Sequence, residues 1–253
     1  MDMQIPKKLH LIWVGDAHKL PEKCINSWRD NHPQWEFKLW TDKDLLQRKW
    51  INQSHLESFL HKGHWSAVAD LMRYEILFRE GGVYADADSF SLRPLDHWLL
   101  ENEMFACWEN TLAEGRARLV SNAFLGSVAR NPFLGFLIDT IRKRKELFER
   151  WSWGRMRYVR MSAWKSVGPF RLTRCIYDYD GGRGYHNISI LPSHMFCPNH
   201  YRGKLYGGNG LVYADHAWAS TRKVYNYLSD EPGEFAYSPV SLPALGEEAL
   251  QTA

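Results

Sequence analysis

The sequence predicts an α/β fold in which helices flank a mostly parallel central sheet. The apolar run from Ile5 to Gly15 is typical of a buried first strand, and a helical segment and an alternating strand follow it before residue 41. A second helical run, residues 65–80, leads through the glycine pair Gly81-Gly82 into another apolar strand. Strands that alternate with helices favour a parallel sheet, because a helical crossover returns the chain to the same end of the sheet.

The first elements each show a clear apolar pattern. Residues 21–31 are predicted to be a helix, and its candidate core positions are Cys24, Ile25 and Trp28. Residues 33–40 alternate between large apolar and polar side chains, as in a strand with one buried face. Thr41-Asp42 then begins another helix. In open α/β sheets ligands bind at the carboxyl ends of strands, so Trp13, near the end of the first strand, is expected beside a ligand site.

The helix at residues 65–80 combines an apolar stripe with two charged residues. Its apolar positions recur at spacings of three and four: Trp65, Val68, Ala69, Met72, Ile76 and Leu77. Asp70 and Arg73 lie three residues apart and therefore on one face, where they can pair with each other or hold a polar ligand together.

Shorter elements are expected in the second half of the chain. Asn131-Pro132 is predicted to begin a helix that continues to about Trp151, and residues 188–191 form a strand at the edge of the sheet. The glycine-rich residues 203–210 are either a lid over a ligand or a loop without further role. The remaining expected elements are a short helix at 95–100, strands at 103–109 and 121–127, and a helix after Gly168-Pro169.

Length and composition indicate one globular domain. The 253 residues suffice for a single α/β core, which we place at residues 1–228, with a Pro-, Ser-, Glu- and Gly-containing tail at 229–253 that we expect to be disordered. A net charge of +3 gives no reason to expect nucleic acid as a partner. Aromatic residues make up 14% of the chain, which suits a protein that stacks sugars or bases as well as one with a large aromatic core.

The cysteines and the N-terminus favour a cytoplasmic protein. Cys24, Cys107, Cys175 and Cys197 are far apart and lack the spacing of zinc ligands, so we expect buried, reduced thiols. Residues 1–8 contain no apolar signal-peptide core, and no apolar run is long enough to span a membrane.

The turn Asp86-Ala87-Asp88 is the first candidate site. Residues i and i+2 of a strand face the same side, so both carboxylates can point into one site. Such a close pair repels unless a positive group lies between them, and a hard divalent cation would also bind phosphate. An exposed acidic turn is the alternative interpretation of this spacing alone.

The wider motif resembles a known family. Residues 69–74 (ADLMRY) and 81–88 (GGVYADAD), with their fixed spacing, resemble the DXD sugar transferases, which include the yeast initiating mannosyltransferase type, bacterial capsular polysaccharide transferases and, distantly, the clostridial glucosylating toxins. Similarity continues through SNAFLGS at 121–127, GPFRLT at 168–173 and the segment around His216, although Val167 stands where the family usually has Thr or Ser. The resemblance implies a single GT-A-like domain.

The resemblance also implies roles for individual residues. Asp86, Asp88 and His216 would bind Mn²⁺ or Mg²⁺, while Asp70 and Arg73 would hold the sugar hydroxyls and the diphosphate. The expected catalytic residues are therefore Asp70, Arg73, Asp86 and Asp88. The expected donor-binding residues are Trp13 and Tyr84 at the base, Asn122 beside the sugar, and Trp218 and Ser220 over the phosphates. A structural hydrogen-bonding role is the alternative for Asn122.

Residues 142–160 have two interpretations. This segment contains eight Arg or Lys and two Glu, interleaved with aromatic residues. A solvated helix face explains such a run. The alternative is a peripheral contact with anionic lipid at the inner face of the membrane, which would suit a lipid-linked acceptor.

The predicted function is a metal-dependent, retaining hexose transfer from a nucleotide-diphosphate sugar, with a UDP-sugar favoured, to a glycan, glycolipid or lipid-linked acceptor. One alternative is a protein-modifying, toxin- or effector-like transferase, and another is a non-catalytic nucleotide-sugar-binding scaffold. A phosphatase with an Asp-x-Asp nucleophile is disfavoured, because such enzymes carry the pair after the first strand and follow it with Thr or Val, whereas Ser89-Phe90 follows it here.

Overall fold

The computed structural model describes residues 4–109, 119–144, 149–152, 154, 156–160, 162–179, 187–200, 204–222 and 228. The predicted tail at 229–253 lies outside these residues, as does Gly203 of the glycine-rich loop. At the centre is a six-stranded sheet in the order β2-β1-β3-β6-β5-β9. Its strands are β1 (Lys8–Ile12), β2 (Glu36–Trp40), β3 (Gly82–Ala85), β5 (Met104–Trp108), β6 (Val120–Ser127) and β9 (Ile188–Leu191).

Five strands of this sheet point in the same direction, and β6 alone runs opposite to them. The pairs β1–β2, β1–β3 and β5–β9 are parallel, whereas β6 is antiparallel to both β3 and β5. The reversed strand is central for function, because its N-terminal half lies at the sheet edge where the other strands end. The α/β class, the helix-flanked sheet and the edge position of residues 188–191 are as predicted.

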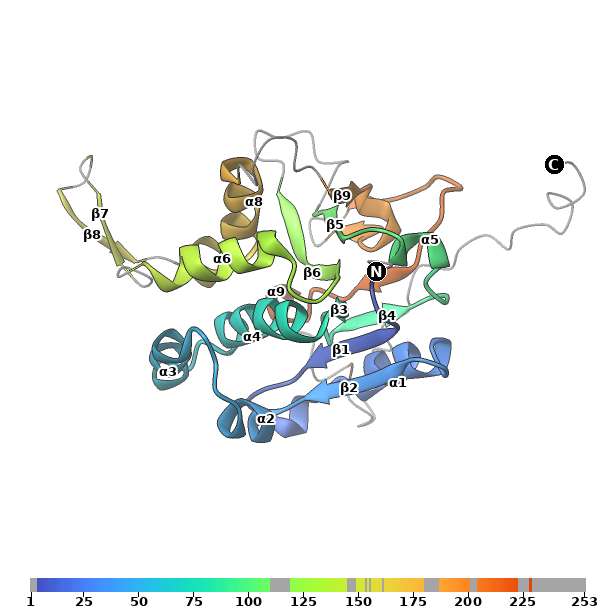
Figure 1. Cartoon of the computed structure of the whole chain (residues 1–253), viewed down its shortest axis with the longest axis horizontal. Helices are drawn as coiled ribbons and strands as arrows, with labels where there is room; N and C mark the ends of the chain where they lie inside the picture. The colour runs from blue at the N-terminus through green and yellow to red at the C-terminus, as the bar shows by residue number, and fades with distance from the viewer. Residues whose placement is uncertain are drawn as a thin grey trace, which may run out of the picture.

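Helices cover both faces of the sheet (Figure 1). The core on one face includes residues of α3, α4, α6 and α8, and the core on the other includes residues of α1 and α5. On β3, Tyr84 belongs to the first core while Val83 and Ala85 belong to the second, as the alternation of a strand requires. The helices are α1 (Glu22–Asn31), α2 (Asp42–Gln47), α3 (Gln53–His61), α4 (Trp65–Glu80), α5 (His97–Leu100), α6 (Pro132–Arg142), α7 (Ala163–Ser166), α8 (Pro169–Asp178) and α9 (Ala219–Arg222), with 3-10 turns η1 (Ala17–Lys19) and η3 (Ser193–Met195).

Two small ladders lie beside the central sheet. The strand β4 (Ser89–Ser91) pairs antiparallel with β12 (Ala214–His216), in a register that sets His216 opposite Ser89. The strands β10 (Asn199–His200) and β11 (Lys204–Leu205) form the other ladder. The β4–β12 ladder matters most, because it joins the end of the chain to the turn that carries the aspartate pair.

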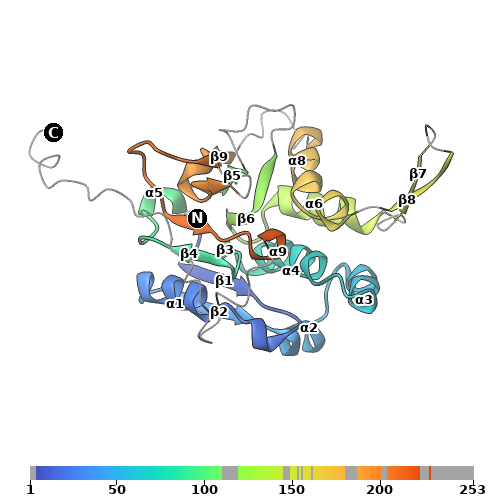
Figure 2. The same cartoon turned by 180° about the vertical axis from the view of Figure 1, so that it is seen from behind.

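The predicted helix from Asn131 to about Trp151 is too long. Helix α6 ends at Arg142, and β7 (Glu149–Ser152) and β8 (Arg157–Arg160) form an antiparallel hairpin. The apolar periodicity that buries α6 ends at Ile141, and four consecutive cations follow at 142–145, so no apolar face remains to hold a longer helix against the core. The hairpin projects away from the body of the protein in both views (Figures 1 and 2).

Two further features concern the cysteines and the membrane. All four cysteines are buried free thiols, as predicted. Within the described residues, no helix combines the length and the apolar character that crossing a bilayer requires.

Candidate active site

The aspartate turn follows directly from β3. Every residue of β3 is buried, and the strand begins after Gly81, whose φ of 65° ends α4 in a conformation that favours glycine. The Asp86 N–H donates to the Ala123 carbonyl at 2.9 Å, which keeps the start of the turn attached to β6. The Ser89 hydroxyl and N–H both donate to the Asp86 carbonyl, at 2.6 Å and 3.1 Å. The turn is therefore closed by its own hydrogen bonds before β4 begins.

His216 reaches the turn through the β4–β12 ladder. Because His216 is paired with Ser89, its side chain lies beside Asp88, although 128 residues separate the two positions in sequence. The Asp88 carbonyl accepts the Ala217 N–H at 2.9 Å, and the Asp88 carboxylate accepts the Ala219 N–H at 2.8 Å. The aspartate turn and the segment around His216 thus hold each other in place.

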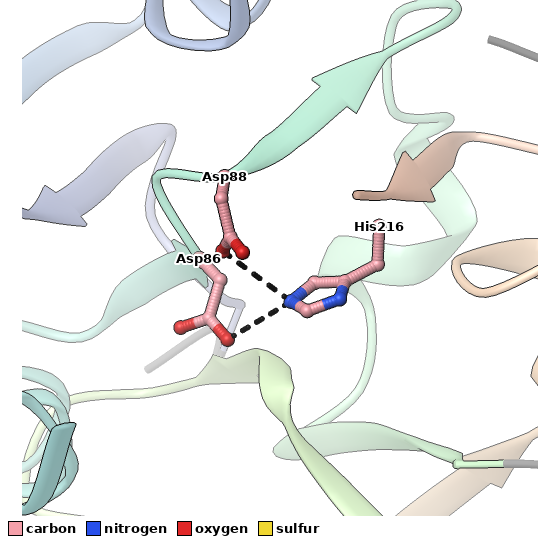
Figure 3. Close-up of side chains that lie close together, drawn as sticks. All are labelled: Asp86, Asp88 and His216. Atoms are coloured by element: carbon pink, nitrogen blue, oxygen red, sulfur yellow. Dashed lines mark hydrogen bonds and ion pairs between the residues drawn. The ribbon is translucent and has the colours of Figure 1, made fainter. Parts of the chain in front are cut away.

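Asp86, Asp88 and His216 point toward one another (Figure 3). His216 Nε2 lies 3.3 Å from Asp86 Oδ2 and 3.5 Å from Asp88 Oδ1. Each residue offers one ligand atom, and these three atoms all lie within 4.8 Å of one another. Two carboxylate oxygens and one imidazole nitrogen are a suitable donor set for a divalent ion such as Mn²⁺, so the three predicted metal ligands fit a metal site.

The electrostatics of this cluster also favour an added cation. Burial raises the pKa of Asp88. Burial alone would lower the pKa of His216, but Asp88 and Asp86 outweigh it and raise that pKa to about 9. In the metal-free protein the imidazole therefore takes up a proton to balance the carboxylates. A divalent ion would replace that proton and bind the neutral imidazole.

Arg73 joins the Asp86–Asp88–His216 cluster to Asp70. Its guanidinium lies 3.0 Å from Asp86 Oδ1 and 3.1 Å from Asp70 Oδ1, and it donates to the Asn122 carbonyl at 2.6 Å. Burial would raise the pKa of Asp86, but Arg73, His216 and Tyr84 together outweigh burial and keep that pKa below its usual value. Asp86 therefore remains ionised, as a metal ligand must be. Arg73 also lies over the Tyr84 ring, 4.4 Å from its centroid.

Asn122 connects Asp70 to the neighbouring helices. Its side-chain N–H₂ donates to Asp70 Oδ1 at 2.7 Å and to the Tyr74 hydroxyl at 3.1 Å, and that hydroxyl donates to the Val167 carbonyl at 3.1 Å. Burial raises the pKa of Asp70 to about 6, against the opposing effect of Arg73. Val167 is fully buried in the core, which explains an apolar residue at a position where the family usually carries a hydroxyl.

Two adjoining cavities open over these residues. The Trp13 cavity has a volume of about 510 Å³ and is lined by Trp13, Trp65, Tyr84, Asp88 and His216, among others. The Trp164 cavity has a volume of about 620 Å³ and is lined by Asp70, Asn122, Ser162, Trp164 and Pro169, among others. Both cavities share His64, Ser66, Arg73, Asp86 and Ser220. These volumes lie in the usual range for small-molecule sites.

The cavities bring together all but one of the predicted site residues. Trp218 lines neither cavity; its indole lies edge-on to His216 with ring centroids 4.5 Å apart, and its Nε1–H donates to the Asn199 carbonyl at 2.7 Å. Tyr84 is 1% exposed, and its hydroxyl donates to Asp86 Oδ1 at 2.6 Å. Tyr84 therefore orients the Asp86 carboxylate in this structure, and its contact with a base stays a prediction.

The residues at the start of α4 line the site although none of them was a predicted site residue. Trp65 was expected on the buried stripe of the helix, but it is 43% exposed and lines the Trp13 cavity between His64 and Ser66. A Cβ at Gly15 would lie 3.1 Å from the Trp65 ring, so the glycine after the first strand leaves room for this indole. The position of Trp65 in the sequence could have predicted this. A helix that precedes a parallel strand begins at the carboxyl edge of the sheet, where ligands bind.

The sequence comparison agrees with this geometry. Residues 19–105 match the model of a family described as "Glycosyltransferase sugar-binding region containing DXD motif". The matched segment includes Asp70, Arg73, Asp86 and Asp88.

Curated relatives match a longer part of the chain than the family model does. The chain is 30% identical over 147 residues to inositol phosphoceramide mannosyltransferase 1 of Schizosaccharomyces pombe, which covers 55% of this chain and 44% of the relative. It is 32% identical over 108 residues to the initiation-specific alpha-1,6-mannosyltransferase of Candida albicans, which covers 39% of this chain and 28% of the relative. The chain thus spans less than half the length of these relatives. The predicted recognition of the DXD family is confirmed.

Comparison of structures confirms the predicted GT-A-like fold. The solved structure of the PaToxG glycosyltransferase matches with a TM-score of 0.52 at 16% identity, covering 71% of each chain. In this chain, Arg73, Asp86 and Asp88 lie within the region that the family model matches, whereas Asn122, Trp164 and His216 lie outside it.

Proposed function

We propose that this chain is a metal-dependent glycosyltransferase that moves a hexose from a nucleotide-diphosphate sugar to a glycan or glycolipid hydroxyl. The carrying observation is the Asp86–Asp88–His216 cluster, held by Arg73 at the floor of a cavity of about 510 Å³ with Trp13 in its wall. An indole wall suits a nucleobase, and a bound cation at the floor suits a diphosphate.

Mn²⁺ is the proposed metal, with Mg²⁺ as the alternative, because the donor set includes an imidazole nitrogen. When bound by Asp86, Asp88 and His216, the ion would supply Lewis-acid neutralisation of the charge that grows on the leaving diphosphate.

The other residues position these ligands and exclude water. The Arg73 guanidinium contacts Asp70, Asp86 and the Asn122 carbonyl, so its first task is to hold the two carboxylates. Asp70 is 6% exposed and lines the Trp164 cavity, where its carboxylate can accept from a sugar hydroxyl. Ser220 is exposed, lines both cavities and follows Trp218, in keeping with a place over the phosphates.

A retaining reaction is the proposed stereochemical course. Among the described residues that line the cavities, Asp70 and Asp86 are paired with Arg73, Asp88 lies beside His216, and Asp16 is paired with Lys19 at 3.1 Å. A carboxylate held in an ion pair is a weak nucleophile, which argues against a covalent glycosyl–enzyme intermediate. For a retaining course the acceptor hydroxyl would then attack from the leaving-group face. The anomeric C1–O bond to the diphosphate breaks, the acceptor oxygen bonds to C1, and its proton passes to the departing phosphate oxygen.

The identity of the sugar separates two versions of this proposal. Sequence analysis favours a UDP-sugar by analogy within the family. Both relatives named above are mannosyltransferases by their names, which favours mannose and makes GDP-mannose the first alternative donor. Donor choice depends on single hydroxyl contacts, so a panel of donors separates the two versions.

The acceptor is proposed to be a glycolipid or glycan. A lipid-linked acceptor would require the protein to contact the membrane. One relative acts on inositol phosphoceramide by its name, which supports a lipid-linked acceptor. The β7–β8 hairpin carries Arg150, Arg157 and Arg160 and projects from the body (Figure 2), so it could contact anionic headgroups without a membrane-spanning helix. Protein modification and a non-catalytic scaffold remain the alternatives.

Donor hydrolysis tests the proposal. The purified chain is mixed with UDP-glucose, UDP-galactose or GDP-mannose, with Mn²⁺ or EDTA, and released nucleotide is measured. We expect metal-dependent release from one donor and its loss in Asp88→Asn, because the amide keeps an acceptor for the Ala219 N–H but lacks the charge. The control is Asp30→Asn, an exposed aspartate on α1, which should match the wild type.

A second readout separates the alternatives. Thermal melting with and without Mn²⁺ and nucleotide reports binding independently of turnover. Stabilisation by donor without release from any donor or acceptor would support a scaffold. No release and no stabilisation would contradict the transferase proposal, provided that the Asp88→Asn and wild-type proteins melt cooperatively in EDTA.

A further inference from the structure

The Trp164 cavity has a wall that the metal site does not need. Its floor is formed by Asp70, Arg73 and Asp86; Asp86 belongs to the Asp86–Asp88–His216 cluster, and Arg73 is paired with both carboxylates. Its opposite wall is formed by Ser162, Trp164 and Pro169, at the junction of α7 and α8. None of these wall residues lies within residues 19–105, and none lines the Trp13 cavity.

The wall presents one exposed indole, that of Trp164. Trp164 is 43% exposed although it lines a cavity, and Phe170 is 37% exposed. The two rings meet edge to face, with centroids 5.8 Å apart and an interplanar angle of 88°. Lys165 Nζ lies 5.0 Å from the centre of the Trp164 ring. The edge contact with Phe170 supports the indole from the side and leaves part of its surface exposed.

This wall is rigidly attached to the floor of the cavity. Gly168 begins α8, and a Cβ there would lie 2.7 Å from Trp164 Cα and 3.0 Å from Asp70 Oδ2. The Tyr74 hydroxyl donates to the Val167 carbonyl at 3.1 Å. The distance between the Trp164 wall and Asp70 is therefore set by close backbone packing rather than by a free loop.

The lining has the chemistry of a carbohydrate site. Ser66 and Ser162 offer hydroxyl groups to this cavity beside the Trp164 indole, and Asp70 and Asn122, which are expected to hold the donor sugar, line the same cavity. A pyranose or cyclitol ring has the matching surface, since its axial C–H groups form an apolar face and its equatorial hydroxyls form a polar rim. A purely apolar ligand would leave the polar lining without partners.

We propose that the Trp164 cavity is the acceptor subsite and that Trp164 is the platform on which the sugar or cyclitol ring of the acceptor stacks. The assignment rests on the proposed function and identifies the class of its acceptor. Because the two cavities share Arg73 and Asp86, a ring on Trp164 would present its hydroxyl beside the donor sugar. The exposed side of the cavity leaves room for whatever the ring is attached to.

Binding of simple rings tests the subsite without requiring turnover. The probes are methyl α-mannoside, methyl α-glucoside and myo-inositol at millimolar concentration, observed by saturation-transfer NMR with Mg²⁺ and UDP or GDP present. We expect saturation transfer to at least one probe in the wild type, a strong reduction in Trp164→Ala and recovery in Trp164→Phe. Trp98→Ala is the matched control, because Trp98 is also exposed, at 38%, but lines neither cavity.

Kinetics then locate the effect. With p-nitrophenyl glycosides as acceptors, Trp164→Ala should raise the acceptor KM about tenfold, as expected for loss of one stacking contact. The change in kcat and in donor KM should be smaller, and Trp98→Ala should match the wild type. Hydrolysis of donor by the wild type, measured in the same assays, reports the proposed function separately.

Three outcomes would overturn the subsite. The first is unchanged probe binding and acceptor KM in Trp164→Ala. The second is an equal rise in donor KM, which would place Trp164 in the donor site. The third is the failure of every ring probe to bind to a wild type that does hydrolyse donor, which would favour a peptide acceptor instead.

Discussion

Arg73 and Asp86 are joined by an ion pair of 3.0 Å, and the same guanidinium lies 3.1 Å from Asp70. One arginine thus holds two carboxylates at a fixed separation: Asp86, which belongs to the Asp86–Asp88–His216 cluster, and Asp70, which lines the Trp164 cavity. Its third contact, to the Asn122 carbonyl at 2.6 Å, attaches all of them to β6. The planar fork of arginine suits this task, whereas a lysine would offer a single point charge.

Arg73→Lys is therefore expected to reduce turnover and stability together. A lysine keeps the charge but cannot reach Asp70, Asp86 and the Asn122 carbonyl at once, so we expect a loss of about 2 kcal/mol in the free energy of unfolding. Urea denaturation and metal-dependent donor hydrolysis measure the two effects. Arg29→Lys, at an exposed position on α1, should change neither by more than experimental scatter. Full activity in Arg73→Lys would contradict the bridging role.

Tyr84→Phe separates two roles for this residue. If the ring contacts the nucleobase, phenylalanine should preserve donor binding and metal affinity alike. The structure instead shows the hydroxyl donating to Asp86 Oδ1 at 2.6 Å. We expect the apparent Mn²⁺ affinity to fall about tenfold, as is usual when a hydrogen bond to a ligating carboxylate is lost, with a smaller change in donor KM. Metal titration of donor hydrolysis measures the first quantity, and a donor titration at saturating Mn²⁺ measures the second.

The pKa of Asp70 predicts a pH-dependent stability. Burial raises this pKa to about 6, from an ordinary value of 3.8. The folded chain therefore binds the proton more tightly than the unfolded chain does. This contribution to stability is complete below pH 3.8 and is lost as pH rises through about 6. In EDTA, the melting temperature of the wild type minus that of Asp70→Asn should decrease as the pH rises from 3.8 to about 6. A constant difference over this pH interval would contradict the prediction.

Much of the site was predictable because it depends on local rules. The spacing of Asp86 and Asp88, and the helical spacing of Asp70 and Arg73, place these pairs on common faces regardless of the rest of the fold. The place of His216 followed only from family resemblance, since its contact with Asp88 depends on the pairing of β12 with β4 across the chain. Periodicity alone does not predict such long-range pairing.

Other features needed the three-dimensional structure. The end of α6 at Arg142 and the following hairpin were missed, because a charged and aromatic run fits a solvated helix as well as a projecting hairpin. Trp164 was missed because α7 is only four residues long and has no periodicity from which a face can be assigned. Its importance follows from the cavity that it shares with Asp70, which no local pattern reports.

Charge reversal in the hairpin tests the proposed membrane contact. We expect the wild type to float with vesicles that contain an anionic phospholipid and the triple variant Arg150→Glu, Arg157→Glu, Arg160→Glu to remain unbound. The control reverses three exposed lysines elsewhere: Lys7, Lys23 and Lys43. Both variants change the net charge of +3 by the same amount. Equal loss of flotation in both would indicate attraction by overall charge and contradict a contact through the hairpin.

Gly168 lies where the backbone of α7 packs closely against Asp70. A methyl group there would approach Trp164 Cα to 2.7 Å and Asp70 Oδ2 to 3.0 Å, and the backbone contact cannot be relieved by a side-chain rotation. Gly168→Ala should therefore move α7 away from Asp70, lower the melting temperature and reduce transfer to acceptor more than donor hydrolysis. Gly154→Ala is the control, since a Cβ there meets no atom within 4 Å. Equal losses of transfer and hydrolysis would mean that this junction supports only the donor side.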